Sequence, residues 1–373
     1  MKRVLFITNL PSPYRVDFFN CLSQYCDLTV CYERKVAAGR NAGWTGIINR
    51  SYKEVFLDCT PIMEDSSIGL GVIKEIRKQN FDVLFLTNYS SPSIFLAVLY
   101  CRAKKIPYII EYDGGFNVPS SFLKKQVKRL LLAGATVHMT TSHDHKQYLI
   151  SLGIRPESIV IYPFSSVLEK EIINKPVSDD EKRRLKESLH LSDKKTVIAV
   201  GRFIQVKGFD TLLEAIPKVK EDADYLLIGG TSCEEYKTIL AKHGIQNVRF
   251  IDFMSKETLF KYYQAADVFV LPTRHDFWGL VINEAMANGL PIITTYQCVA
   301  GKELIKNGYN GYLVNPDDKD TLSEKINTIL SDDVLRKSMA EHSIEVIRGY
   351  SIETMASAHK TIVTEGISSS LVR

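Results

Sequence analysis

The sequence lacks any apolar run long enough to cross a membrane. The run at residues 93–100, SIFLAVLY, is among the longest and falls well short of the ~18 residues that a spanning helix needs. The apolar start of the chain is short and continues into a predicted strand, so we do not interpret it as a signal peptide. We therefore expect a cytoplasmic protein, either soluble or peripheral on the inner face of the membrane.

Paired metal-binding cysteines and a strong excess of charge are also missing. The seven cysteines are odd in number and include no CxxC pair, which favours buried thiols in a reducing compartment. The net charge of +4 is too small to indicate a dedicated nucleic-acid-binding protein, so we expect no nucleic-acid partner.

The charge is nevertheless unevenly distributed. Residues 1–165 contain 20 Lys and Arg against 13 Asp and Glu, whereas the remainder contains 27 against 30. The positive charge gathers in RAKK at 102–105 and in KKQVKR at 124–129. Such runs are usually solvated faces, but they also suit attraction to an anionic membrane or a phosphorylated substrate.

The sequence does contain a regular alternation of strand-like and helix-like segments, which predicts an α/β fold with doubly wound parallel sheets. Because a polar, charged segment at 168–195 divides the alternation into two series, we expect two Rossmann-like domains facing each other across a cleft. The expected boundaries are 1–168, 169–349 and a final helical segment at 350–373 that returns to the first domain. The predicted strands are 3–8, 27–33, 81–86, 107–112, 135–141 and 158–164 in the first series, and 196–203, 224–230, 247–253, 267–273, 290–295 and 311–315 in the second.

Two cations follow the first strand of the second series. In VGRFIQVKGFDTLLEA, Arg202 and Lys207 lie on a loop between a strand and a helix. Cations beside a helix amino terminus suit phosphate oxygens. Taken alone, the motif is equally compatible with two surface charges.

The stretch RHDFWGLVINEAMANGLP at 274–291 carries two carboxylates eight residues apart. The pattern predicts a loop carrying Asp276 and a helix carrying Glu284, between two strands. The amides of Gly279, Leu280 and Val281 are unpaired donors at the expected helix start. If strands 197–201 and 267–271 are neighbours, these amides and the two cations face one pocket that could hold a diphosphate. Alternatively, Asp276 is a turn or cap residue and Glu284 an exposed helix carboxylate.

Four segments resemble, in order and spacing, the carboxyl-terminal domain of the family 4 retaining glycosyltransferases, which have the GT-B fold. They are GRFIQVKGFDTLLEA, FMSKETLFKYYQAADVFVLPT, DFWGLVINEAMANGLPIITT and NGYNGYLV, within residues 196–316. The family signature is E-x7-E, usually followed by AMA-x-G-x-P. Asp276 replaces the first Glu of that signature.

The resemblance implies a role for each matching residue. Arg202 and Lys207 would hold the donor diphosphate, with Gly279, Leu280, Val281 and Trp278 also on the donor side. Glu284 would bind the ribose and Asp276 the donor sugar, and these two acids are the catalytic candidates.

The resemblance also implies a reaction. It is the transfer of a hexose or N-acetylhexosamine from a nucleotide-sugar to a saccharide or lipid-linked acceptor, with retention of the anomeric configuration. The expected nucleotide is UDP. The expected pathway is the synthesis of a bacterial surface polysaccharide, either capsule or lipopolysaccharide. No metal or other cofactor is expected. A sugar-nucleotide epimerase of the same architecture and a catalytically inactive binding homologue remain the alternatives.

The acceptor side is less defined. The loop TNLPSPYR at 8–15 lacks the glycine-rich form of many family members, and places Tyr14 and Arg15 towards the cleft or simply at a helix start. In EYDGG, Glu111 or Asp113 ends a strand where relatives place a histidine, although Asp113 also suits a turn. The segment 121–135, SFLKKQVKRLLLAGA, joins cationic and apolar parts that suit a bilayer interface, while its apolar part equally suits a buried core.

Overall fold

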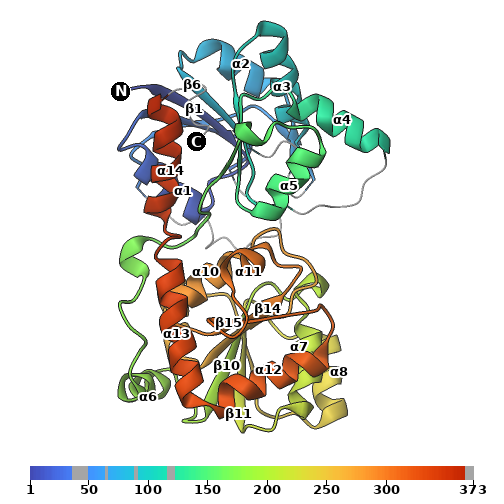
Figure 1. Cartoon of the computed structure of the whole chain (residues 1–373), viewed down its shortest axis with the longest axis vertical. Helices are drawn as coiled ribbons and strands as arrows, with labels where there is room; N and C mark the ends of the chain where they lie inside the picture. The colour runs from blue at the N-terminus through green and yellow to red at the C-terminus, as the bar shows by residue number, and fades with distance from the viewer. Residues whose placement is uncertain (36–48, 64–65, 88–90, 116–121, 366–373) are drawn as a thin grey trace. The chain divides into compact units, whose positions relative to one another are not determined.

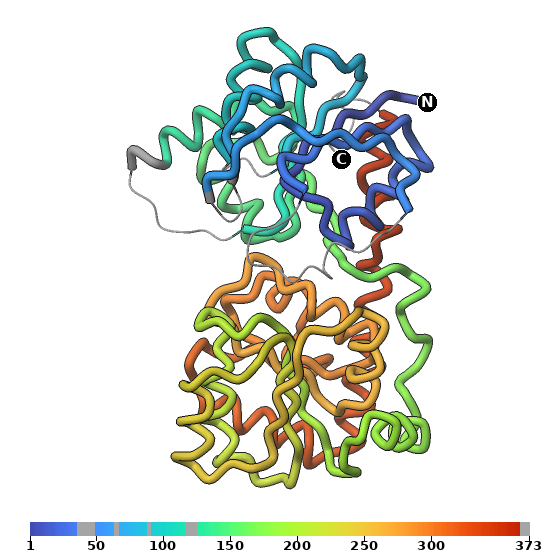
Figure 2. The backbone as a smooth tube through the Cα atoms, turned by 180° about the vertical axis from the view of Figure 1, so that it is seen from behind, coloured from blue at the N-terminus to red at the C-terminus, as the bar shows by residue number. Residues whose placement is uncertain are grey.

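The computed structural model describes residues 1–35, 49–63, 66–87, 91–115 and 122–365. They form two compact units, one of residues 1–165 with the segment from 351 onward and one of residues 166–350. The boundaries thus fall at 165/166 and 350/351. The last helix, α14, belongs to the first unit, where it runs beside α1 (Figures 1 and 2).

The first domain is built on a parallel sheet in the order β3-β2-β1-β6-β7-β8-β9. Its helices lie on both faces, as expected of a doubly wound sheet (Figure 1). The strands are β1 (Arg3–Thr8), β2 (Asp27–Tyr32), β3 (Lys53–Phe56), β6 (Val83–Thr87), β7 (Ile109–Glu111), β8 (Val137–Thr140) and β9 (Ile159–Ile161). The helices are α1 (Pro13–Leu22), α2 (Gly71–Lys78), α3 (Pro92–Lys104), α4 (Phe122–Leu132), α5 (His143–Ser151) and α14 (Ile352–Glu365).

Alternate residues of the strands supply the two faces, because successive side chains of a strand point to opposite sides. Leu5 and Ile7 of β1 join the core that α2, α3 and α5 cover. Phe6, between them, packs against Phe18 and Phe19 of α1 on the other face.

The six strands predicted in this domain are present. The sequence analysis missed three others: the edge strand β3, and the antiparallel pair β4 (Thr60–Met63) and β5 (Ser66–Ile68). All three are at most four residues long.

The second domain has a six-stranded parallel sheet in the order β12-β11-β10-β13-β14-β15. All six strands were predicted, as was an exposed helix, α6, within residues 168–195. The strands are β10 (Lys195–Val200), β11 (Ala223–Ile228), β12 (Val248–Ile251), β13 (Val268–Leu271), β14 (Ile292–Thr295) and β15 (Gly311–Val314). The helices are α6 (Asp179–Ser188), α7 (Phe209–Ala215), α8 (Glu234–His243), α9 (Lys256–Ala265), α10 (Leu280–Ala287), α11 (Val299–Leu304), α12 (Lys319–Ser331) and α13 (Asp333–Ile347).

Candidate active site

The loops that follow β10 and β13 are joined to each other by hydrogen bonds. The two strands are neighbours, as the sequence analysis required, with Val197 opposite Val268. Beyond the strand ends, Val206 O accepts hydrogen bonds from Thr273 Oγ1 at 2.9 Å and from Arg274 N at 2.8 Å. Residues distant in sequence are thereby held at one carboxyl edge of the sheet, where open α/β folds bind ligands.

Gly208 allows the two loops to approach this closely. Its φ is +68°, a conformation that favours glycine, and a Cβ there would lie 2.1 Å from Pro272 O. No other residue type fits without moving the backbone of one loop.

Lys207 and Asp276 meet between these loops. Lys207 Nζ lies 2.5 Å from Asp276 Oδ2, and the two side chains are 18% and 15% exposed. The backbone of Asp276 is anchored to the loop after β14, because its N–H donates to Gln297 O at 2.9 Å and its carbonyl accepts from Val299 N at 3.2 Å. The structure therefore joins two residues that the sequence analysis had selected from separate motifs.

The amino terminus of α10 lies in the same loop. Gly279 caps the helix at φ +98°, and a Cβ there would lie 2.7 Å from Cys298 Sγ. Leu280 and Val281 form the first turn, whose N–H groups have no carbonyl of a preceding turn to bind.

Trp278 lies in the loop between Asp276 and α10. Its ring is buried and its indole N–H donates to Asn283 Oδ1 at 2.8 Å. The side chain thus packs inside the second domain and links the loop to α10 through Asn283.

Glu284 projects from α10, as predicted, and is half-buried, so the alternative of an exposed helix carboxylate does not hold. Its two oxygens accept hydrogen bonds from Ser166 Oγ at 3.2 Å and Tyr263 OH at 3.4 Å. Burial raises the pKa of this carboxyl group, while nearby Lys256 and the two donors act in the opposite direction. Arg202, by contrast, is exposed on its loop.

The first domain also gathers polar side chains at the carboxyl edge of its sheet. Arg15 Nη1 donates to Glu111 Oε1 at 2.6 Å, Arg15 Nη2 donates to Asp113 Oδ1, and Tyr14 OH donates to Asp113 Oδ2 at 3.4 Å. The four residues named from sequence therefore form one cluster. Arg15 lies in the first turn of α1, its side chain is 2% exposed, and both terminal nitrogens bind carboxylates.

Two members of this cluster were missed. His359 Nε2 lies 3.0 Å from Glu111 Oε2, and Tyr162 OH donates to Glu111 Oε1 at 3.2 Å. No spacing in the sequence could have revealed them, since residues 15, 111, 162 and 359 come together only when the sheet and α14 assemble.

The second domain resembles known proteins in sequence. Residues 180–346 match the family model described as Glycosyl transferases group 1. The second domain therefore resembles the group 1 glycosyltransferases over almost its whole length.

Similar sequences include an uncharacterized glycosyltransferase of Methanocaldococcus jannaschii, 30% identical over 226 residues, which are 58% of this chain and 57% of that protein's length. The N,N'-diacetylbacillosaminyl-diphospho-undecaprenol alpha-1,3-N-acetylgalactosaminyltransferase of Campylobacter jejuni is 23% identical over 283 residues, covering 73% of this chain and 74% of that protein. The crystal structure of Anabaena HepE in complex with UDP matches with a TM-score of 0.78 at 15% identity, covering 98% of this chain and 100% of that one. At this identity the likeness shows the fold alone, which is GT-B.

Two short motifs in the chain suggest metal ligands but have structural roles. In HDH, at 143–145, His145 is buried and bonds Thr140 Oγ1 at 2.7 Å. In DKD, at 318–320, Asp318 caps α12 by accepting from Thr321 N. Among the described residues, no group of three or more His, Cys, Asp and Glu side chains is placed to hold a metal ion.

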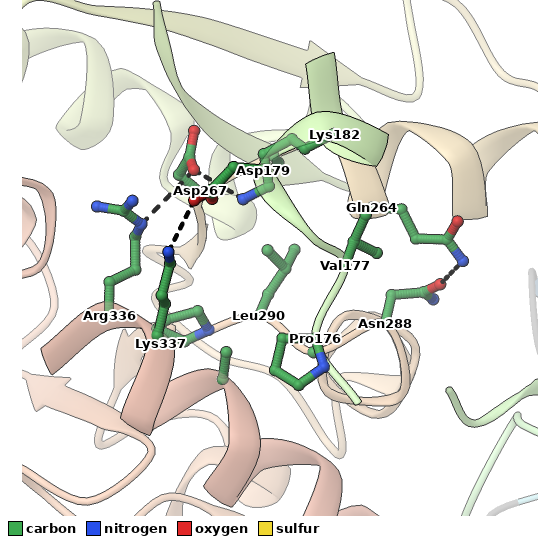
Figure 3. Close-up of a pocket in the computed structure, with 14 residues that line it drawn as sticks. Pro176, Val177, Asp179, Lys182, Gln264, Asp267, Asn288, Leu290, Arg336 and Lys337 are labelled. Carbon is green, nitrogen blue, oxygen red and sulfur yellow. Dashed lines mark hydrogen bonds and ion pairs between the residues drawn. The ribbon is translucent and has the colours of Figure 1, made fainter. Parts of the chain in front are cut away.

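A separate pocket lies at the opposite edge of the second domain, since it is lined partly by Asp267, the residue before β13, whereas Asp276 follows that strand. Figure 3 shows the residues that line it. Asp267 Oδ1 binds Lys182 Nζ at 2.8 Å and lies 3.6 Å from Arg336 Nε. The polar wall of this pocket is thus occupied by ion pairs of the domain itself.

In the part of the chain that the structure describes, no helix is both long and apolar enough to span a bilayer.

Proposed function

We propose that the chain transfers a hexose or N-acetylhexosamine from a nucleotide-sugar, with UDP as the nucleotide, to a saccharide acceptor, with retention of the anomeric configuration. The observation that carries the proposal is the Lys207–Asp276 pair, held between two joined loops beside the start of α10. The site offers one cation and one carboxylate side by side, which suits a substrate that is anionic at one end and rich in hydroxyls at the other.

The donor diphosphate would lie against Lys207, Arg202 and the first amides of α10. Cations and helix-start N–H groups stabilise negative charge that grows on a leaving diphosphate. Because a diphosphate gives Lys207 a second anion to bind, Asp276 becomes able to accept hydrogen bonds from the sugar hydroxyls. These groups supply the charge that a metal ion would otherwise provide, so we infer activity without a metal.

The reaction breaks the anomeric C–O bond, and the electron pair remains on the diphosphate oxygen. The acceptor oxygen forms the new bond on the same face of the sugar, and its proton passes to the departing phosphate oxygen. Asp276 orients the donor sugar in this scheme and forms no covalent bond.

Glu284 would bind the ribose diol. Its carboxylate already accepts two hydroxyl donors, Ser166 and Tyr263, so hydroxyl recognition fits its surroundings. A ribose would replace or share these partners.

The proposed acceptor is lipid-linked, and α4 would bring the protein to the cytoplasmic leaflet. On this helix Lys125 and Arg129 are exposed together with Val127 and Leu130, which are 48% and 62% exposed. Leu132 is buried in the core, so the helix has one face for the protein and one apolar, cationic face towards solvent. Residue 121 and the side chains of residues 122–124, Lys124 included, lie outside the described part of the chain.

The test measures UDP binding by calorimetry and sugar transfer from a panel of UDP- and GDP-sugars. We expect Lys207→Ala and Glu284→Ala to weaken UDP binding and Asp276→Asn mainly to lower turnover, each by roughly 10–150-fold, since one charge-assisted hydrogen bond is worth about 1.5–3 kcal/mol. Lys237→Ala, which removes an exposed lysine paired with Glu234 on α8, is the matched control and should change nothing. Activity should survive EDTA. Wild-type behaviour in all three site variants would overturn the proposal, and rescue of EDTA-treated protein by Mn²⁺ would overturn its metal-free part.

A further inference from the structure

A chain of polar side chains in the first domain runs from the core to the surface. His359 on α14 contacts Glu111 at the end of β7, Glu111 accepts from Arg15 on α1, and Arg15 in turn donates to Asp113. His359, Glu111 and Arg15 are completely or almost completely buried, whereas the Asp113 side chain is 43% exposed. The chain of contacts therefore begins inside the domain and ends at a carboxylate that solvent can reach.

The hydrogen-bond partners fix the protonation of the buried members. His359 Nδ1 lies 2.8 Å from Met355 O, and because a carbonyl oxygen carries no proton, the ring must donate there. Nε2 of the same ring lies 3.0 Å from Glu111 Oε2, so these two atoms share a further proton. The His359–Glu111 pair is then neutral as a whole, and Asp113 is the counter-ion of Arg15.

The surroundings make this balance necessary. The Arg15 guanidinium lies within 5.9 Å of the rings of Phe6, Phe18 and Phe164, and the His359 ring lies 4.7 Å from that of Phe18. Removing charges from water into such an apolar environment is costly, and buried ion pairs therefore contribute little net stability. What the cluster does provide is a fixed geometry.

The fixed geometry of the cluster orients the carboxylate of Asp113. Arg15 holds one of its oxygens and Tyr14 holds the other, at 3.4 Å, so a solvent-accessible carboxylate is fixed in one orientation at the edge of the sheet. Each oxygen keeps further lone pairs, which can accept from the hydroxyls of a sugar.

We propose that His359 is a positioning residue for acceptor recognition: through Glu111 and Arg15 it fixes Asp113, which accepts hydrogen bonds from acceptor saccharide hydroxyls. This inference rests on the proposed function, because it assigns the acceptor side of the same reaction. It gives α14 a part in substrate binding although His359 touches no substrate.

The test compares His359→Phe with Ile362→Ala. Phe suits the aromatic surroundings but removes both ring nitrogens and their hydrogen bonds. Ile362 is buried on the same helix, so its truncation lowers stability without touching the cluster. Binding of a panel of p-nitrophenyl hexosides, and their KM as acceptors with UDP-sugars, are measured for both variants and for Asp113→Asn.

We expect His359→Phe and Asp113→Asn to raise the hexoside Kd and KM by about tenfold or more, with UDP affinity and kcat nearly unchanged, since a lost charge-assisted hydrogen bond has about that effect. Ile362→Ala should keep the wild-type KM. His359→Gln, which retains one amide donor, should recover part of the loss and also replaces the Phe variant if that protein does not fold.

A second readout does not depend on transfer. In ¹⁵N-histidine-labelled protein, Nδ1 of His359 should carry a proton because it faces Met355 O, and an unprotonated Nδ1 would overturn this hydrogen-bond assignment. Hexoside binding by the His359 variants equal to that of wild type would overturn the positioning role. A wild-type protein that binds hexosides through Asp113 but transfers no sugar would instead count against the proposed function alone.

Discussion

Lys207 and Asp276 of the second domain are 18% and 15% exposed, whereas Arg15 and Glu111 of the first domain are 2% and 0% exposed. Both pairs lie at the carboxyl edge of a parallel sheet, but they can do different things. A partly exposed pair can exchange its partner for an arriving anion, because water and ligand reach it. A buried pair cannot, so it holds a geometry that other side chains use.

The same contrast appears in two glutamates. Burial raises the pKa of Glu284, which has only neutral donors in direct contact, whereas two adjacent cations lower the pKa of Glu111 despite its burial. One carboxylate is destabilised as an anion in the folded protein and the other is stabilised. A carboxylate of the first kind gains from a ligand that donates hydrogen bonds, which agrees with the ribose role proposed for Glu284.

The largest expected effect is a difference in the stability of variants at these two glutamates. Glu111→Gln removes the carboxylate that contacts both Arg15 and His359 and leaves the buried Arg15 cation poorly balanced. It should lower the free energy of unfolding by about 3–5 kcal/mol at pH 7. Glu284→Gln removes a charge that burial disfavours, and should leave stability unchanged or slightly higher. Denaturant unfolding of both variants and the wild type measures the difference.

The contributions of the two carboxylates to stability should depend on pH with opposite signs. The folded-state pKa of Glu111 lies below its ordinary value of 4.5, so its stabilisation is complete above that value and is lost as the pH falls through it towards about 2. The folded-state pKa of Glu284 lies above 4.5, so any gain from Glu284→Gln appears only as the pH rises above 4.5. Equal losses in the two variants at pH 7 would show that the two carboxylates are not held differently.

A smaller effect tests the joined loops of the second domain. Gly208 and Gly244 have nearly the same φ, +68° and +66°, but a Cβ at Gly208 would lie 2.1 Å from Pro272 O, whereas nothing lies within 4 Å at Gly244. Gly244→Ala should therefore cost only the left-handed conformation, about 1 kcal/mol. Gly208→Ala should cost about 1–3 kcal/mol more, because the loops must separate, and should also weaken UDP binding. Thermal unfolding and UDP calorimetry of both variants decide this, and matching results would mean that the close approach of the loops is unimportant.

The two domains also differ in how much of them could be predicted. In the second domain, strand periodicity predicted the sheet, and one compact motif contains Asp276, Gly279 and Glu284. The expected neighbouring positions of β10 and β13 then placed the cations of the other loop beside that motif. The sequence did not reveal that Arg274, within the same stretch, holds Asp210 and Asp317 by ion pairs, since those partners come from α7 and the loop before α12. In the first domain the fold was predictable, but the burial of Arg15 and the role of His359 depend on α14 covering α1, which no local pattern encodes.

The smallest expected effect is on membrane binding. Here too the two domains differ, because only the first carries a surplus of positive charge. If α4 binds anionic lipid, reversing Lys125 and Arg129 to Glu should reduce co-sedimentation with phosphatidylserine vesicles by roughly 30-fold at low salt, at about 1 kcal/mol for each basic residue lost. Lys128 is left unchanged because it donates to Tyr148 OH at 3.1 Å. Reversing Lys74 and Arg77, two exposed cations of α2, makes the same change in net charge on another helix and should have a clearly weaker effect. Wild-type protein that ignores the vesicles, or equal losses in the two charge-reversed proteins, would exclude α4 as a membrane-binding face and favour an acceptor that is free in solution.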